Sequence, residues 1–120
     1  MKVLIADDSK VMRQIVKRTL RQAGYADAEV TEAGNGLEAL DVIAAGAPDL
    51  VLSDWNMPEM NGIELLHALR AQGHPVPFGF VTSEGSPEMR DQAQSAGALF
   101  LVSKPFTPDS FREALAPVLG

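Results

Sequence analysis

Five short apolar runs divide this chain of 120 residues, and segments with helical periodicity separate them. The runs are residues 3–6, 28–32, 50–53, 78–82 and 99–103. Because they are rich in Val, Leu, Ile and Phe, they are typical of parallel strands that are buried on both faces. Strict alternation of strands and helices, joined by short loops, predicts an α/β fold. We expect a doubly wound, flavodoxin-like (βα)5 sandwich whose five-stranded parallel sheet has the order 2-1-3-4-5.

Apolar stripes in the intervening segments indicate which side of each predicted helix faces the sheet. The first stripe consists of Val11, Met12, Ile15, Val16, Thr19 and Leu20. The other stripes are Leu37, Leu40 and Ala44; Ile63, Leu66 and Leu69; Met89, Ala93 and Ala96; and Phe111, Leu115 and Val118. The first helix also carries basic residues at helical spacing, which we interpret as a solvated surface. These are Arg13, Lys17, Arg18 and Arg21.

Capping residues agree with these boundaries. Ser86-Pro87 and Thr107-Pro108 each place a hydroxyl at the N-cap and a proline at the first helical position. Four glycines stand where the first four helices should end, the usual place for a left-handed C-cap. They are Gly24, Gly46, Gly73 and Gly97. Gly79 interrupts the fourth strand, where we expect it to make room for a close neighbour.

Length and composition favour one ordinary globular domain over residues 1–120, with 46% apolar and 22% charged residues. The net charge of −6 argues against direct nucleic acid binding, because phosphate backbones need clustered Lys and Arg. No apolar stretch approaches the length that crosses a membrane, so we expect no membrane insertion. The absence of cysteine excludes disulfides and thiolate metal sites, and it fits the cytoplasmic location that we expect.

Polar side chains follow four of the predicted strands, at the point where each strand ends. They are Asp7 and Asp8 after the first, Asp54 after the third, Thr82 and Ser83 at the end of the fourth, and Lys104 after the fifth. In a doubly wound parallel sheet, ligands bind beyond the carboxyl ends of the strands. We therefore expect these side chains to converge on one edge of the sheet.

Three acids packed together would repel one another, and a nearby negative charge raises the pKa of a carboxyl group. A hard divalent cation relieves this repulsion, and oxygen ligands with room for water suit Mg²⁺. We therefore expect a Mg²⁺ site formed by Asp8, Asp54, the backbone carbonyl of Asn56 and water molecules. Asp7 would hold one or more of those water molecules.

A carboxylate beside Mg²⁺ can attack a phosphorus centre and form an aspartyl phosphate, and we expect Asp54 to be that carboxylate. Lys104 and Mg²⁺ would supply positive charge to the phosphoryl oxygens, which is the main requirement of phosphoryl transfer. The hydroxyl of Thr82, with Ser83 beside it, would bind a phosphoryl oxygen. The added charge would then pull Thr82 and the following loop inward. The sequence thus predicts a signalling switch rather than a turnover enzyme.

At this point four separated segments resemble the response-regulator receiver domains, across essentially the whole chain. The segments are residues 3–9 (VLIADDS), 54–62 (DWNMPEMNG), 80–83 (FVTS) and 104–106 (KPF). Residues 53–62 are especially similar to chemotaxis regulators of the CheY type. The resemblance implies a phosphorylation-dependent switch of a two-component system, with a role in chemotaxis.

The resemblance also implies the partners. The phosphoryl donor would be a phosphohistidine on a histidine kinase, and the chain has no Gly-x-x-x-x-Gly-Lys loop that would bind ATP itself. The surface of the fourth helix, fifth strand and fifth helix would meet an output protein or domain. By the same analogy, Asn56 and Glu84 would tune the dephosphorylation rate, and the Lys104–Pro105 peptide would be cis.

One position departs from the family pattern. Many relatives have an aromatic residue three positions before the lysine that follows the fifth strand, and it changes rotamer on activation. This chain has Leu101 there, with Phe100 one step earlier. Strand alternation puts Phe100 and Leu101 on opposite faces, so Phe100 cannot simply substitute without a change of register. The sequence therefore leaves open how a signal would be relayed outward.

Alternatives remain at this stage. The chain ends at Gly120, as a stand-alone chemotaxis regulator would, but a receiver domain of a longer transcriptional or enzymatic regulator would look the same. A small phosphatase with an aspartate nucleophile would need a second acid two residues later, where this chain has Asn56. A flavin-binding module would need a phosphate loop in place of the two acids after the first strand. We expect Trp55 to be a partly exposed loop residue, and His67 and His74 to be surface residues.

Overall fold

Strands and helices alternate along residues 1–119, which are the residues that the computed structural model describes. The elements are β1 (Lys2–Ala6), α1 (Lys10–Gln22), β2 (Glu29–Ala33), α2 (Gly36–Ala45), β3 (Leu50–Ser53), α3 (Gly62–Ala71), β4 (Phe78–Thr82), α4 (Pro87–Ala96), β5 (Phe100–Ser103) and α5 (Pro108–Leu119). Every strand pairing is parallel, and the sheet order is β2-β1-β3-β4-β5. The predicted fold and strand order are therefore confirmed.

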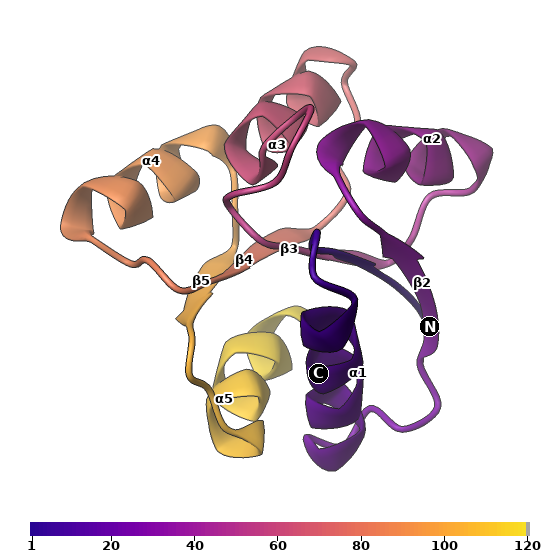
Figure 1. The fold of residues 1–120 in the computed structure, drawn as a ribbon, viewed down its shortest axis with the longest axis vertical. Helices are drawn as coiled ribbons and strands as arrows, with labels where there is room; N and C mark the ends of the chain where they lie inside the picture. Colours follow the sequence, from indigo (N-terminus) through magenta and orange to yellow (C-terminus); the bar gives the residue numbers. More distant parts are fainter. Residues whose placement is uncertain (120) are drawn as a thin grey trace.

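The helices cover both faces of the sheet (Figure 1). In that view α2, α3 and α4 lie above the sheet, while α1 and α5 lie below it. Two hydrophobic clusters fill the space between the layers, one on each face. Because side chains alternate along a strand, Leu4 joins the cluster on one face, and Val3 and Ile5 join the other.

The second strand differs from its prediction. It runs from Glu29 to Ala33 at the edge of the sheet, and Glu29, Thr31 and Glu32 are exposed. Because an edge strand has a neighbour on one side alone, polar residues can occupy it, so the expectation of a strand buried on both faces is wrong here. Strands β1, β3 and β4, in the middle of the sheet, are buried almost throughout.

The buried side of α2 is also not the one expected. Its buried residues are Gly36, Ala39 and Ile43, whereas Leu37 is 46% exposed and Ala44 is exposed. A side chain at Gly36 would meet the Met60 carbonyl oxygen at 2.6 Å, so the helix begins in close contact with the loop before α3. Small residues permit this approach, and they turn Leu37 toward solvent.

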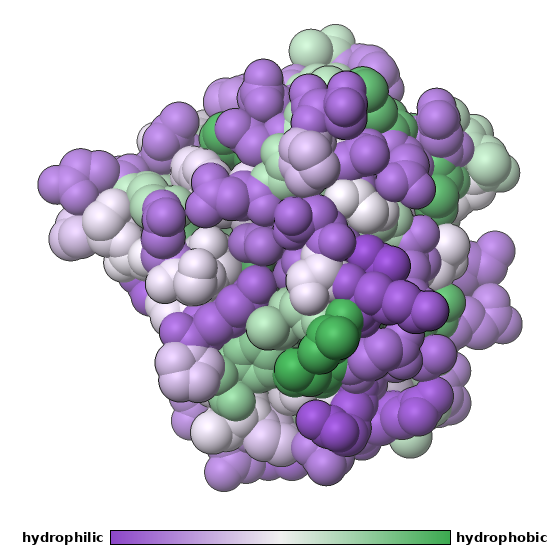
Figure 2. All heavy atoms as spheres, in the orientation of Figure 1, coloured by the Kyte–Doolittle hydropathy of each residue, from purple (hydrophilic) through white to green (hydrophobic). Residues whose placement is uncertain are grey.

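Val11 departs from its predicted stripe on α1 as well. It is 70% exposed, while Val16, Thr19 and Leu20 of the same stripe are buried. Figure 2 shows a hydrophobic patch over the beginning of α1, on a face that is otherwise mostly hydrophilic. The stripe therefore packs against the sheet through Met12, Val16 and Leu20, whereas Val11 faces solvent.

The predicted caps are mostly present. The hydroxyls of Ser86 and Thr107 accept hydrogen bonds from the backbone N–H groups of Met89 and Ser110. Three of the four predicted glycines have the positive φ of a left-handed cap, and these are Gly24, Gly73 and Gly97. Gly46 is an exception, because its φ of 177° is extended and the chain runs on directly toward Pro48. Within residues 1–119, no helix is long and apolar enough to cross a membrane.

Candidate functional site

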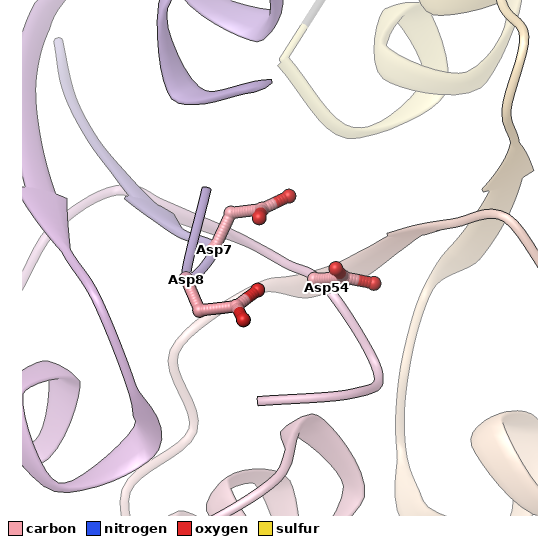
Figure 3. Close-up of side chains that lie close together, drawn as sticks. All are labelled: Asp7, Asp8 and Asp54. Atoms are coloured by element: carbon pink, nitrogen blue, oxygen red, sulfur yellow. The ribbon is translucent and has the colours of Figure 1, made fainter. Parts of the chain in front are cut away.

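Three carboxylates meet at the edge of the sheet where the strands end (Figure 3). Asp7 and Asp8 follow β1, and Asp54 follows β3, its neighbour in the sheet. One carboxylate oxygen from each residue lies within 4.8 Å of the other two. Asp7 is buried and Asp54 half-buried, whereas Asp8 is exposed at the mouth of the site. The convergence predicted from strand ends is thus observed for the acids.

Lys104, which directly follows β5, brings a positive charge to this cluster. Its Nζ lies 3.1 Å from Oδ2 of Asp7 and 3.4 Å from Oδ2 of Asp54. The backbone fixes the lysine, because the Lys104 N–H donates to the Thr82 carbonyl at 2.8 Å. One ammonium group thus faces three carboxylates, and it contacts two of them.

Backbone hydrogen bonds hold the two inner acids in place. The Asp7 N–H donates to the Ala33 carbonyl at 3.0 Å, and Asp7 Oδ1 accepts from the Ser9 N–H at 2.9 Å. The Asp54 N–H donates to the Ala6 carbonyl at 2.8 Å, which joins β3 to β1 immediately below the acids. Both carboxylates are therefore oriented by the folded backbone itself.

Two further residues support the site, and the sequence did not single them out for it. Arg13 Nη1 donates to the Asp7 carbonyl at 2.6 Å and Nε pairs with Glu32 at 2.9 Å, so Arg13 ties α1 to the strand ends. A side chain at Gly62 would collide with the Asp54 carbonyl oxygen, so α3 can begin there only with glycine. The sequence signal that could have identified Arg13 is its position one turn into the helix that follows Asp7 and Asp8.

Burial raises the pKa of the Asp54 carboxyl above its ordinary value of 3.8. The Lys104 charge works in the opposite direction, the Asp7 charge adds to the rise, and the hydrogen bond from the Trp55 N–H lowers the pKa. The net effect is a carboxylate whose negative charge is poorly compensated in the folded protein. Such a charge favours binding of a cation or uptake of a proton.

This pKa shift predicts how the Asp54→Asn variant responds to pH. A carboxyl whose pKa is raised by folding stabilises the protein below the unfolded-state pKa, and that stability is lost as pH rises through the folded-state pKa. We therefore expect Asp54→Asn to be more stable than the wild type at pH 7 without Mg²⁺. The difference should shrink toward pH 4, and urea unfolding at both pH values measures it. A variant that is less stable at pH 7 would contradict this account of the charge.

The remaining predicted residues surround the acids on neighbouring loops. Thr82 is fully buried at the end of β4, and its Oγ1 accepts a hydrogen bond from the Glu84 N–H at 3.2 Å. Asn56 Nδ2 donates to Glu84 Oε1 at 3.5 Å, which connects the loop after β3 with the loop after β4. Ser83 is exposed beside Thr82.

Phe100 and Leu101 lie on opposite faces of β5, as strand alternation required. Leu101 packs against the cluster that contains Phe80, and Phe100 packs against the cluster that contains Phe111. A side chain at Gly79 would collide with the ring of Phe100, so this ring is the close neighbour for which Gly79 makes room. Leu101 therefore reaches a different part of the core from Phe100.

Trp55 is not the partly exposed loop residue that we expected. It is 8% exposed, and its ring lies 4.7 Å from the ring of Phe80 between centroids. The side chain turns inward because β4 presents Phe80 beside it, while the backbone N–H of Trp55 donates to Asp54 Oδ1 at 2.7 Å.

Two further sequence expectations concern residues outside the cluster of acids. His67 is exposed, and His74 is half-buried. The Lys104–Pro105 peptide is cis, as the resemblance implied.

The donor atoms of this edge suit a hard divalent cation. The three carboxylates of the cluster offer oxygen atoms as ligands, and because Asp8 is exposed, water can reach the site. A surface hollow of about 420 Å³, lined by Asp8, Asn56 and Asn61 among others, adjoins it. These residues fit Mg²⁺ better than a softer metal, which would prefer nitrogen or sulfur ligands.

Known proteins resemble this chain over its whole length. Residues 3–116 match the family model of the response regulator receiver domain. Chemotaxis protein CheY1 of Helicobacter pylori strain J99 is 44% identical over 123 residues, which cover 100% of this chain and 98% of that protein. The chemotaxis protein CheY homolog of Campylobacter jejuni strain 81-176 is also 44% identical, over 100% of this chain and 93% of its own length. The solved structure of chemotaxis protein CheY4 of Vibrio cholerae has a TM-score of 0.85 and 40% identity over 98% of each chain.

Proposed function

Because the chain belongs to the response regulator receiver domain family, we propose that it is a two-component switch in which Asp54 accepts a phosphoryl group. The observation that carries the proposal is the meeting of Asp7, Asp8 and Asp54 with Lys104 at the carboxyl ends of the strands. The close relatives are chemotaxis proteins, and this supports a role in chemotaxis.

In the proposed reaction, a carboxylate oxygen of Asp54 attacks the phosphorus of a phosphohistidine on a histidine kinase. A bond forms between that oxygen and phosphorus, and the bond from phosphorus to the imidazole nitrogen breaks. Lys104 lies within reach of Asp54 and would stabilise the negative charge on the phosphoryl oxygens. The hydroxyl of Thr82 would bind one of these oxygens after transfer, with Ser83 beside it.

Mg²⁺ fits the same site. Asp8, Asp54 and the backbone carbonyl of Asn56 would hold the ion, and Asp7 would hold water beside it. When bound, Mg²⁺ supplies positive charge that offsets the negative charge of the carboxylates and of the phosphoryl oxygens. The contact between Asn56 and Glu84 lies next to this position, which supports a role for both side chains in the lifetime of the phosphorylated state.

Incubation with acetyl phosphate and Mg²⁺ tests the proposed function without the unidentified kinase. We expect the intact mass to increase by about 80 Da, the mass of one phosphoryl group, and to return to the original value on standing. The Mg²⁺-free protein should gain far less mass in the same time. A protein that stays unmodified in the presence of both reagents would contradict the proposal.

Trp55 provides a separate test of the metal ligands. Because Trp55 is buried and hydrogen-bonded to Asp54, we expect its fluorescence to change when Mg²⁺ binds. The Asp8→Ala variant should need roughly tenfold more Mg²⁺ or more, because it lacks one ligand. The matched control is Asp41→Ala, which removes an exposed acid from α2 and should behave as the wild type. Equal Mg²⁺ affinity in Asp8→Ala and the wild type would rule out Asp8 as a ligand.

Membership of the same family also supports a proposal for the surface that binds the output partner. The face made by α4, β5 and α5 would bind the output partner, and a phosphoryl group at Asp54 would alter this face through Thr82 and the loop after β4. That loop is connected to the site, because the Glu84 N–H donates to Thr82 Oγ1. Movement of the Thr82 hydroxyl toward a phosphoryl oxygen would therefore disturb the loop.

A further inference from the structure

Arg90 of α4 forms hydrogen bonds with the loop after β4 and with β5, two segments between the proposed phosphorylation site and the proposed output surface. Its Nε donates to the carbonyl of Gly85, in the loop between β4 and α4, at 3.3 Å. Its Nη1 donates to the carbonyl of Leu101 at 3.3 Å, and its Nη2 donates to Oγ of Ser103 at 3.1 Å. One guanidinium group thus joins the loop to β5, the edge strand that lies next to α4 in Figure 1.

The loop and the strand are in close contact at this point. A Cβ atom at Gly85 would lie 2.7 Å from Ser103 Oγ, 3.4 Å from Arg90 Nη2 and 3.6 Å from Leu101 Cδ2. The three hydrogen bonds of Arg90 therefore hold together surfaces that already touch. A small displacement of Gly85 would stretch the bond to its carbonyl, because the guanidinium group is also fixed to β5.

The loop is joined to the phosphorylation site at its other end. Thr82 Oγ1 accepts the hydrogen bond of the Glu84 N–H, and Gly85 is the next residue. In the proposed function this hydroxyl turns toward a phosphoryl oxygen, so its contact with Glu84 weakens and the position of Gly85 changes. A shift of Gly85 would alter its hydrogen bond to Arg90, and the guanidinium group would pass the change on to β5, the edge strand.

Arg90 also stands between two hollows on the proposed output surface. One hollow, of about 480 Å³, is lined by Ala98 and Leu99 among others, and the second, of about 450 Å³, by Ser110 and Glu113 among others. Arg90 and Leu101 line both of them. Release of Arg90 from Leu101 and Ser103 would therefore change the lining of both hollows.

We propose that Arg90 is a latch that holds the loop after β4 against β5 in the unphosphorylated protein and is released when Asp54 is phosphorylated. The inference rests on the proposed function and adds the regulation of its output surface. It supplies a link between site and surface in a chain where Leu101 takes the place of an aromatic residue. Arginine suits this role, because its planar fork of five donors can reach three acceptors at once, whereas the ammonium of lysine is a single point.

Hydrogen–deuterium exchange of the backbone amides tests the latch, with and without acetyl phosphate and Mg²⁺. In the wild type, we expect phosphorylation to accelerate exchange roughly three- to tenfold in residues 85–90 and 99–103. Arg90→Ala and Arg90→Lys should show this faster exchange before phosphorylation, with little further change after it. Gly85→Ala should act in the same direction, because the added methyl group separates the loop from Ser103. The control is Arg18→Ala, which removes an exposed arginine from α1 and should behave as the wild type.

Intact mass measured on the same samples separates the latch from the proposed function. If the wild type gains no phosphoryl group, the proposed function fails, whatever the exchange rates show. If all variants are phosphorylated but Arg90→Ala exchanges as the wild type in both states, the latch is wrong. Faster exchange that extends to β1 and β3 would also overturn it, because general loosening of the fold would then explain the result.

Discussion

Asp54→Asn is expected to abolish the mass increase that acetyl phosphate and Mg²⁺ produce in the wild type. The amide has no carboxylate oxygen to attack phosphorus, yet it has nearly the same size and keeps an oxygen that can accept the Trp55 N–H. Because burial raises the pKa of the Asp54 carboxyl, we expect this variant, which lacks the charge, to be at least as stable as the parent at neutral pH. Loss of labelling can therefore be assigned to the chemistry.

The control for this experiment is Asp41→Asn, which removes an exposed carboxylate from α2. It should gain about 80 Da at the wild-type rate. Continued labelling of Asp54→Asn would place the acceptor on another residue and would overturn the role proposed for Asp54. Loss of labelling in both variants would show that the assay responds to overall charge rather than to the site.

Lys104→Met is expected to produce the largest loss of stability among substitutions at the site. Removal of the ammonium leaves the buried Asp7 and the half-buried Asp54 without the cation that contacts both of them. We expect a loss of about 2 kcal/mol at pH 7, below the about 3–5 kcal/mol of a fully buried pair, because water reaches this edge of the sheet. Labelling by acetyl phosphate should also slow by at least tenfold or so, since Lys104 no longer stabilises the phosphoryl oxygens.

The cause of this destabilisation can be tested through pH and Mg²⁺. Without Lys104 the pKa of Asp54 should rise further, so the deficit should be largest at neutral pH and should fade on acidification, as the Asp54 carboxyl becomes protonated. Added Mg²⁺ should reduce the deficit, and urea unfolding measures all of these effects. Lys17→Met, on α1, is the control. A deficit that is independent of pH and Mg²⁺ would point to lost packing of the lysine stem instead.

The sequence was sufficient for the architecture because its central strands are continuous apolar runs. The bounds of β3 and β4 agree with the predicted runs 50–53 and 78–82. Prediction was poorer at the periphery of the sheet, where tertiary contacts determine which side of an element is buried. The buried side of α2 follows from the close approach of Gly36 to Met60, and a periodicity of large apolar residues cannot reveal an approach of that kind.

The candidate site was also largely predictable, because strand ends in a parallel sheet share one edge. Asp7, Asp8, Asp54 and Lys104 come together as expected, and Thr82 contributes a buried hydroxyl on the adjoining strand. What the sequence could not give are contacts between distant segments. The burial of Trp55 against Phe80 and the three bonds of Arg90 depend on the packing of α4, β4 and β5, and no local pattern encodes them.

Direct identification of the modified residue is the most decisive measurement. Borohydride reduces an aspartyl phosphate to homoserine, so the wild type can be treated with acetyl phosphate and Mg²⁺, reduced, digested and sequenced by tandem mass spectrometry. We predict homoserine at position 54, with Asp7 and Asp8 unchanged. Homoserine at either of those positions, with Asp54 intact, would contradict the assignment of Asp54 as the phosphoryl acceptor.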